Sequence, residues 1–169
     1  MSAFRSKMIG SWELVSYTST NQSDPSDILY PMTKHCKGII IYGGDGYMSA
    51  QLQVLDIQHY AKGWRQGSQE ELAQAAKKTM AYTGPFYLEE VPGTKQTLYH
   101  HMDISVPPNW IDGTQIRLAE MVEEDGLQYL YLGPSTPTEN NGVSRDIRLK
   151  WRRLKDNTGA KPPENAPRL

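Results

Sequence analysis

The chain has 169 residues, including one cysteine, 18 basic and 19 acidic residues. This length fits one domain whose core is stable without disulfides, and Cys36 has no second cysteine to pair with. The balanced charge argues against a nucleic-acid partner, which needs a basic face to displace counterions from phosphates. No apolar run reaches the length of a membrane span, and residues 1–8 do not resemble a signal peptide. We therefore expect a cytoplasmic protein without a membrane partner.

Most of the chain has the alternation and composition of short β-strands separated by turns. Residues 43–46 (GGDG) and 124–126 (EDG) tolerate positive φ, so each predicts a hairpin between the flanking strands. Regularly spaced strands with turn signals predict a β-sandwich or a β-barrel. The predicted strands span residues 10–19, 38–42, 47–54, 82–89, 96–104, 114–122, 127–132 and 143–154.

One helix is predicted between the third and fourth strands. Ser68 is a suitable N-cap and Glu71 follows three residues later, which is the pattern of a capping box. Good helix formers continue to about Met80. Such a helix would either close one mouth of a barrel or cover a face of the sheet.

The C-terminal residues differ in composition from the rest of the chain. They are rich in proline and charge and contain almost no large apolar side chains. We therefore expect residues 1–154 to form the folded domain and residues 155–169 to form a disordered tail.

The more apolar parity of each strand should face inward, because water lies outside a small barrel. This rule predicts four inward sets: Met48, Ala50 and Leu52; Leu98, His100, Met102 and Ile104; Ile116, Leu118, Glu120 and Val122; Ile147, Leu149 and Trp151. A polar interior would reverse the assignment for three pairs: Tyr47 and Gln51, His101 and Asp103, Gln115 and Arg117.

Two ionisable residues on the apolar parity, His100 and Glu120, suggest a catalytic pair. If the fifth and sixth strands pair about a loop centred near Asn109, residue 100 lies opposite residue 118 and diagonal to Glu120. A histidine oriented by a carboxylate in an apolar cavity could move protons near neutral pH. The alternative is a buried histidine satisfied by a backbone carbonyl, with Glu120 at the wetter rim.

Motifs for other kinds of chemistry are missing from the sequence. It contains no phosphate-binding glycine loop and no G-x-S-x-G nucleophile elbow. His101 and Asp103 could supply two metal ligands, but no third ligand stands at a telling spacing, so a surface pair is the better interpretation. We therefore expect no metal and no cofactor.

The segment Gly10-Ser11-Trp12 at the start of the first strand resembles the G-x-W signature of lipocalins. The longer pattern is similar to the lipocalin-like domain proteins of bacteria and fungi. The matching segments span nearly all of residues 10–153: GSWELVSY, GIIIYGGDGYMSAQL, AYTGPFYL, YHHMDISVPPNWIDGTQIR and LKWRR.

This resemblance implies a mainly β fold, an antiparallel up-and-down barrel of the calycin type with a small-molecule cavity. It also implies that Trp12 closes the barrel floor. A basic residue of the last strand would pack over this tryptophan, and Arg152 or its neighbours Lys150 and Arg153 are the candidates.

Some lipocalin-like proteins of secondary-metabolite pathways are cofactor-free cyclases, isomerases or dehydratases, and others only bind. We therefore expect binding of a small, largely apolar metabolite and catalysis of a cofactor-free cyclisation, isomerisation or dehydration. The alternative is a non-catalytic intracellular carrier or sensor. A homodimer also stays open, because the barrel edges need not close fully.

The residues expected at this site fall into two groups. Arg117, Tyr129 and Tyr131 could polarise a carbonyl if the parity is reversed, and Trp110 would be either a lid or a loop anchor. The candidate catalytic residues are His100, Glu120 and Arg117; the candidate ligand-binding residues are Met48, Met102, Trp110, Tyr129, Tyr131 and Trp151.

Overall fold

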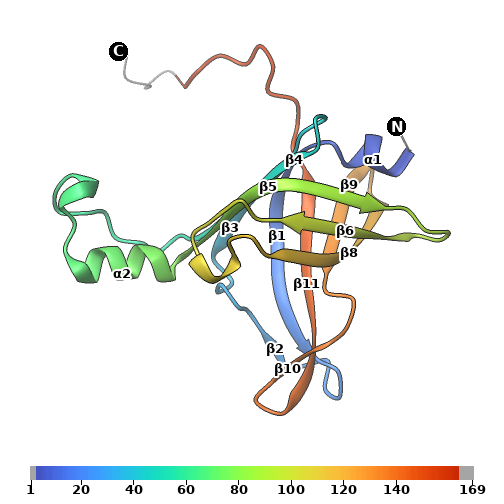
Figure 1. The fold of residues 1–169 in the computed structure, drawn as a ribbon, viewed down its shortest axis with the longest axis horizontal. Coiled ribbons are helices and arrows are strands. Elements are labelled where there is room, and N and C mark those ends of the chain that lie inside the picture. Colours follow the sequence, from blue (N-terminus) through green and yellow to red (C-terminus); the bar gives the residue numbers. More distant parts are fainter. Residues whose placement is uncertain (1–2, 164–169) are drawn as a thin grey trace.

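The computed structural model describes residues 3–163, and within them eight strands close into an antiparallel barrel (Figure 1). These eight strands follow one another around the barrel in the order in which they occur in the chain, and the last pairs with the first, as in an up-and-down barrel. The predicted fold class is therefore confirmed. The barrel strands are β1 (Gly10–Asn21), β3 (Cys36–Tyr42), β4 (Tyr47–Val54), β5 (Thr79–Glu89), β6 (Lys95–His101), β8 (Thr114–Glu124), β9 (Leu127–Gly133) and β11 (Val143–Arg153).

Shorter elements decorate this barrel. The strands β2 (Ile28–Leu29) and β10 (Thr138–Asn140) extend one end of it, and β7 (Ile104–Ser105) pairs with β5. The strand β10 was not among the predicted elements; it forms a hairpin with β11 through Asn141 and Gly142, both at positive φ. The helical elements are α1 (Ala3–Met8), η1 (Trp64–Gln66), α2 (Gln69–Lys77) and η2 (Pro108–Trp110).

The predicted helix is present as α2, between the third and fourth barrel strands. The hydroxyl of Ser68 accepts a hydrogen bond from the Glu71 amide at 3.2 Å, and the Glu71 carboxylate accepts one from the Ser68 amide at 2.7 Å. This is the expected capping box. No residue of α2 is buried, and the helix stands off the barrel (Figure 1), so it contributes nothing to the barrel interior.

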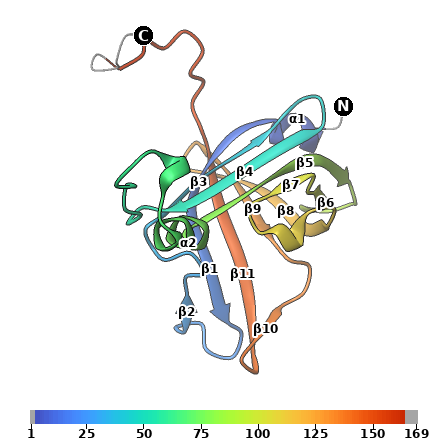
Figure 2. The same cartoon turned by 60° about the vertical axis from the view of Figure 1, so that its left-hand side comes forward.

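A second helix, α1, lies at the end of the barrel opposite β2 and β10 (Figures 1 and 2). This helix was not among the predicted elements. The side chain of Met8, its last residue, is fully buried. The indole Nε1 of Trp12 donates a hydrogen bond of 2.9 Å to the carbonyl oxygen of Met8. The G-x-W tryptophan thus holds α1 against the floor of the barrel.

The basic residue over Trp12 is Arg153, and Arg152 points the other way. The Arg153 guanidinium lies 5.0 Å from the centre of the Trp12 ring. Arg152 instead pairs on the outer face with the carboxylate of Glu13. Gly10 explains the first letter of the motif: its φ is +129°, and a Cβ there would lie 2.9 Å from Arg153 Nη2.

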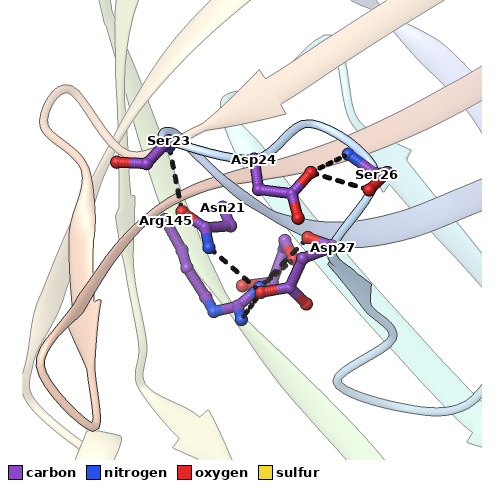
Figure 3. A network of polar contacts seen from close by, with 7 residues as sticks. Asn21, Ser23, Asp24, Ser26, Asp27 and Arg145 are labelled. Carbon is purple, nitrogen blue, oxygen red and sulfur yellow. Dashed lines mark hydrogen bonds and ion pairs between the residues drawn. The ribbon is translucent and has the colours of Figure 1, made fainter.

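The other end of β1 is held by a polar cluster around Arg145, a nearly buried residue of β11 (Figure 3). Its Nη2 lies 2.5 Å from Oδ2 of Asp27, and its Nη1 donates to the carbonyl oxygen of Ser19 at 3.1 Å. The amide of Asn21 donates to the same Asp27 oxygen at 3.1 Å. These contacts fasten the loop between β1 and β2 to the last strand.

The inner face of the barrel follows the predicted parity in β4, the third predicted strand, where Met48, Ala50 and Leu52 are buried. In the fifth predicted strand, which corresponds to β6, His100 is buried as predicted, but Ile104 is 66% exposed. The prediction for Ile104 is wrong because β6 ends at His101, and residues 104–105 form a separate strand.

The C-terminal segment leaves the barrel after β11 (Figure 1). Residues 155–163 form no helix or strand and are exposed. The last six residues of the predicted tail, 164–169, lie outside the described part of the chain. Over residues 3–163, no helix has the length and apolar character needed to cross a membrane.

Candidate functional site

The barrel encloses a cavity of about 130 Å³. A cavity of roughly 150 Å³ in another protein holds benzene, so this volume accommodates about one aromatic ring. Its lining comes from strands around the whole barrel and from η2. The residues of this barrel cavity are Tyr17, Leu52, Met80, Tyr82, His100, Trp110, Gln115, Arg117, Leu132, Leu149 and Trp151.

Four aromatic residues supply much of the wall of the barrel cavity: Tyr17, Tyr82, Trp110 and Trp151. Tyr82 and Trp110 meet edge to face with ring centroids 5.9 Å apart, which ties η2 to β5. Flat, polarisable rings of this kind favour an aromatic guest, because stacked and edge-to-face ring contacts contribute beyond area burial.

The pairing of β6 with β8 decides which polar residues enter the cavity. His100 lies opposite Gln115, so Gln115 and Arg117 share the inner face with it. The predicted register, residue 100 opposite residue 118, is wrong by three positions, and an odd shift exchanges the two faces of a strand. Glu120 lies opposite Lys95 on the outer face, and the predicted pair of His100 with Glu120 is not formed.

Apolar residues on the outer face of β8 are the reason that the parity rule failed. Ile116 is 46% exposed and lies opposite Tyr99, which in turn lies opposite Tyr87. These three side chains lie on the outer face of the barrel, while the alternate residues of β8, Gln115 and Arg117, face the cavity. The reversed assignment that the sequence left open for Gln115 and Arg117 is therefore the one adopted.

His100 is fully buried in the cavity wall. Its Nε2 lies 2.9 Å from the hydroxyl oxygen of Tyr42, and its Nδ1 has no hydrogen-bond partner. Burial, with a smaller effect of the Arg117 charge, lowers the pKa of His100 from 6.5 to about 3. The imidazole is therefore neutral at physiological pH.

The tyrosines around His100 are also held neutral. Burial raises the pKa of Tyr82 to about 12 and raises those of Tyr17 and Tyr42, while the Arg117 charge opposes each shift. The indole Nε1 of Trp151, like His100 Nδ1, is a buried nitrogen without a partner. Neutral hydroxyl and N–H groups of this kind can donate hydrogen bonds to an oxygen of a bound molecule.

Arg117 is the charged residue of the barrel cavity. It donates to the side-chain oxygen of Gln115 at 2.5 Å and to the carbonyl oxygen of Ile116 at 3.0 Å. Among residues 3–163 it forms no ion pair, and no Asp or Glu lines the cavity. The described wall thus presents one cation without a counter-ion.

The structure gathers four of the predicted site residues at the barrel cavity: His100, Arg117, Trp110 and Trp151. Met48 and Met102 are buried in the core but do not line the cavity. Glu120 and Tyr131 line a larger hollow of about 460 Å³ on the outer surface.

Tyr129 and Tyr131 lie outside the barrel because Leu130 and Leu132 occupy the inner positions of β9. The ammonium nitrogen of Lys150 is 4.0 Å from the centre of the Tyr129 ring. The hydroxyl of Tyr131 donates to Glu124 at 2.7 Å. Neither tyrosine therefore lines the barrel cavity in this structure.

Tyr17 and Tyr82, which line the cavity, were not among the residues predicted for the site. A period-two count from the buried Trp12 does not reach Tyr17, because a bulge between Leu14 and Ser16 shifts the parity of β1. Tyr82 had a usable signal, since it lies opposite Ala50, which the parity rule placed inside.

The described residues contain no group of three or more His, Cys, Asp or Glu side chains that could hold a metal ion. His101 and Asp103 do approach each other at the surface, with Nε2 and Oδ1 3.7 Å apart. The Nδ1 of His101 is occupied by a contact of 2.9 Å with the hydroxyl of Thr114.

Comparison with protein families matches residues 9–154 to one described as a lipocalin-like domain. A protein of Aspergillus oryzae, described as a 4'-hydroxy-3'-methoxypropiophenone carrier protein, is 31% identical over 100 residues. The match covers 57% of this chain and 86% of that protein. No solved structure matches the chain significantly.

Proposed function

Because the chain belongs to the lipocalin-like domain family, we propose that it binds a small metabolite of secondary metabolism in its barrel and carries it unchanged. The observation that supports this most directly is the barrel cavity, which has largely apolar walls and a few convergent polar groups. Those are the usual features of a small-molecule site.

The ligand class that we propose is a single aromatic ring bearing a ketone and oxygen substituents. The relative from Aspergillus oryzae is named as a carrier of such a compound. A volume of about 130 Å³ suits one ring. The rings of Tyr17, Tyr82 and Trp110 supply the flat contacts.

The polar groups of the cavity favour carriage over catalysis. A general acid or base works best when its pKa is near the working pH, and His100 has a pKa of about 3. It also lacks the carboxylate partner on which the catalytic hypothesis depended. The alternative is that the protein is a cyclase, isomerase or dehydratase, and the experiment must distinguish this alternative from carriage of an unchanged ligand.

The test is calorimetric titration with 4'-hydroxy-3'-methoxypropiophenone. We expect one ligand per chain, and we expect Leu149→Phe, which fills part of the cavity, to weaken binding. The matched control is Ile39→Phe, because Ile39 is 47% exposed on the outer face. Recovered ligand should be chemically unchanged.

Three results would count against this proposal. If titration of the unmodified protein releases or absorbs no heat, the proposed ligand class is excluded. If Leu149→Phe and Ile39→Phe weaken ligand binding equally, the ligand binds outside the cavity. Conversion of the ligand on incubation, abolished by His100→Gln, would favour the enzyme hypothesis instead.

A further inference from the structure

Arg117 is an unusual residue for the wall of a largely apolar cavity. It lies opposite Leu98, a fully buried residue of β6, so its side chain starts from the inner face of the barrel. Its hydrogen bonds go to two neutral acceptors, the Gln115 side chain and the Ile116 carbonyl. Arg117 is partly buried. A charge partly removed from water without a counter-ion is unfavourable, so a bound anion would be favoured at this position.

The protein itself supplies no negative charge at this place. Burial keeps the phenols near Arg117 in their uncharged forms by raising their pKa, and it keeps the histidine neutral by lowering its pKa. These groups come from four of the barrel strands: Tyr17 on β1, Tyr42 on β3, Tyr82 on β5 and His100 on β6.

Resting on the carrier function proposed above, we propose that the ligand is bound as an anion. Its single aromatic ring lies among the aromatic residues of the cavity, and an ionised oxygen on that ring, phenolate or carboxylate, pairs with Arg117. A guanidinium presents several N–H donors in one plane and stays charged at all relevant pH values, which suits it to this contact.

A phenol with an acyl group in the para position is well matched to such a site. Conjugation with the ketone spreads the negative charge of the phenolate, so this phenol is more acidic than an unsubstituted one. On binding below the solution pKa, the O–H bond breaks, the electron pair stays on oxygen and the proton passes to the buffer. The phenolate absorbs at longer wavelength than the neutral phenol, which gives a direct signal.

The experiment records absorbance spectra of 4'-hydroxy-3'-methoxypropiophenone with and without protein, at a pH below the solution pKa of the phenol. We expect the phenolate band to appear on adding protein. The O-methylated ketone, 3',4'-dimethoxypropiophenone, cannot ionise and should bind more weakly without a band. Affinity for the phenol should be lower at more acidic pH, whereas affinity for the dimethoxy ketone should not change.

Variants at Arg117 separate its charge from its shape. Losing one charge-assisted contact should weaken binding of the phenol roughly ten- to a hundredfold in Arg117→Gln and abolish the phenolate band. Arg117→Lys should restore part of both. Arg148→Gln is the matched control, since Arg148 is an exposed arginine on the outer face of β11. Far-ultraviolet circular dichroism verifies that each variant is folded.

A third compound distinguishes a phenolate ligand from a carboxylate ligand. The compound 3,4-dimethoxybenzoate carries a carboxylate and no phenol, so Arg117-dependent binding of it indicates a carboxylate ligand. If both ketones bind equally to the unmodified protein and to Arg117→Gln without a phenolate band, the anion proposal is overturned while the carrier function stands. If neither ketone and no benzoate binds the unmodified protein, both proposals fail.

Discussion

The hydroxyl oxygen of Tyr42 and Nε2 of His100 lie 2.9 Å apart inside the barrel, although 58 positions separate them in the chain. Both residues are almost completely buried. They belong to β3 and β6, which are separated around the barrel by β4 and β5. The contact therefore crosses the interior and joins walls that share no backbone pairing. The Tyr42 ring also meets Phe86 edge to face, with centroids 5.1 Å apart.

Removing the Tyr42 hydroxyl should destabilise the fold without changing its shape. Tyr42→Phe leaves His100 Nε2 buried without a partner, and an unsatisfied buried polar group costs about 1–3 kcal/mol. Urea unfolding measures the change in free energy. The control is Tyr87→Phe at a residue that is 58% exposed. Equal effects of the two substitutions would contradict a special role for the buried contact.

His100 should make stability depend on pH below neutrality. Its pKa is about 3 in the folded state and near 6.5 when exposed, so the unfolded chain binds the additional proton between these values. Stability is therefore complete above pH 6.5 and falls as the pH drops toward 3. Between pH 7 and 5 this group alone should remove about 2 kcal/mol of unfolding free energy.

The measurement compares urea unfolding of the unmodified protein and His100→Gln at several pH values. Carboxylates contribute to both profiles, so the difference between the two isolates His100. Parallel profiles between pH 7 and 5 would show that His100 is not buried as a neutral imidazole.

Gly10 should tolerate no side chain. At φ +129° an alanine is strained, and its Cβ would lie 2.9 Å from Arg153 Nη2, which is needed over Trp12. Gly10→Ala should lower stability by roughly 1–3 kcal/mol. Gly44→Ala is the control, because a Cβ there meets nothing within 4 Å. Thermal unfolding of the two variants gives the comparison, and a neutral Gly10→Ala would count against the G-x-W explanation.

The Arg145 cluster should fasten the loop between β1 and β2. Arg145→Met leaves the Asp27 carboxylate without its cation and should lower Tm by on the order of several degrees. The side chain of Asp27 is 37% exposed, so we expect a smaller loss than for a fully buried pair. The Arg145 hydrogen bond, aided by Asn21, lowers the pKa of Asp27, so the pair stabilises the fold at neutral pH and is lost as the pH falls below about 3.8.

The control for this cluster is Arg148→Met, at an exposed position three residues along the same strand. Limited proteolysis supplies an independent readout: Arg145→Met should be cut faster within residues 22–35 than the unmodified protein. A variant with unchanged Tm and unchanged cleavage would show that the loop is held by other contacts.

The sequence was sufficient for the eight barrel strands, apart from some of their ends, and for the α2 capping box, because these features depend on neighbours in the chain. The place of Trp12 at the barrel floor came from the resemblance to lipocalins. Side-chain alternation, turn residues and caps act over a few positions, so Met48, Leu52 and Ser68 were placed correctly from local pattern. One local signal was overlooked: Asn141-Gly142 is a strong hairpin pair, and it forms the turn between β10 and β11.

The site was decided by contacts between strands far apart in the chain. Whether Arg117 or Glu120 enters the barrel depends on the register of β6 with β8, which the intervening loop sets. Tyr17 enters because a bulge in β1 changes its parity, and Tyr129 stays outside beside Lys150. Apolar residues on the outer face of β8 made the sequence pattern misleading. Hydrophobic alternation shows which face of a strand is more apolar, but it does not show which face points into the barrel. Only the closed barrel fixes which side is the inside.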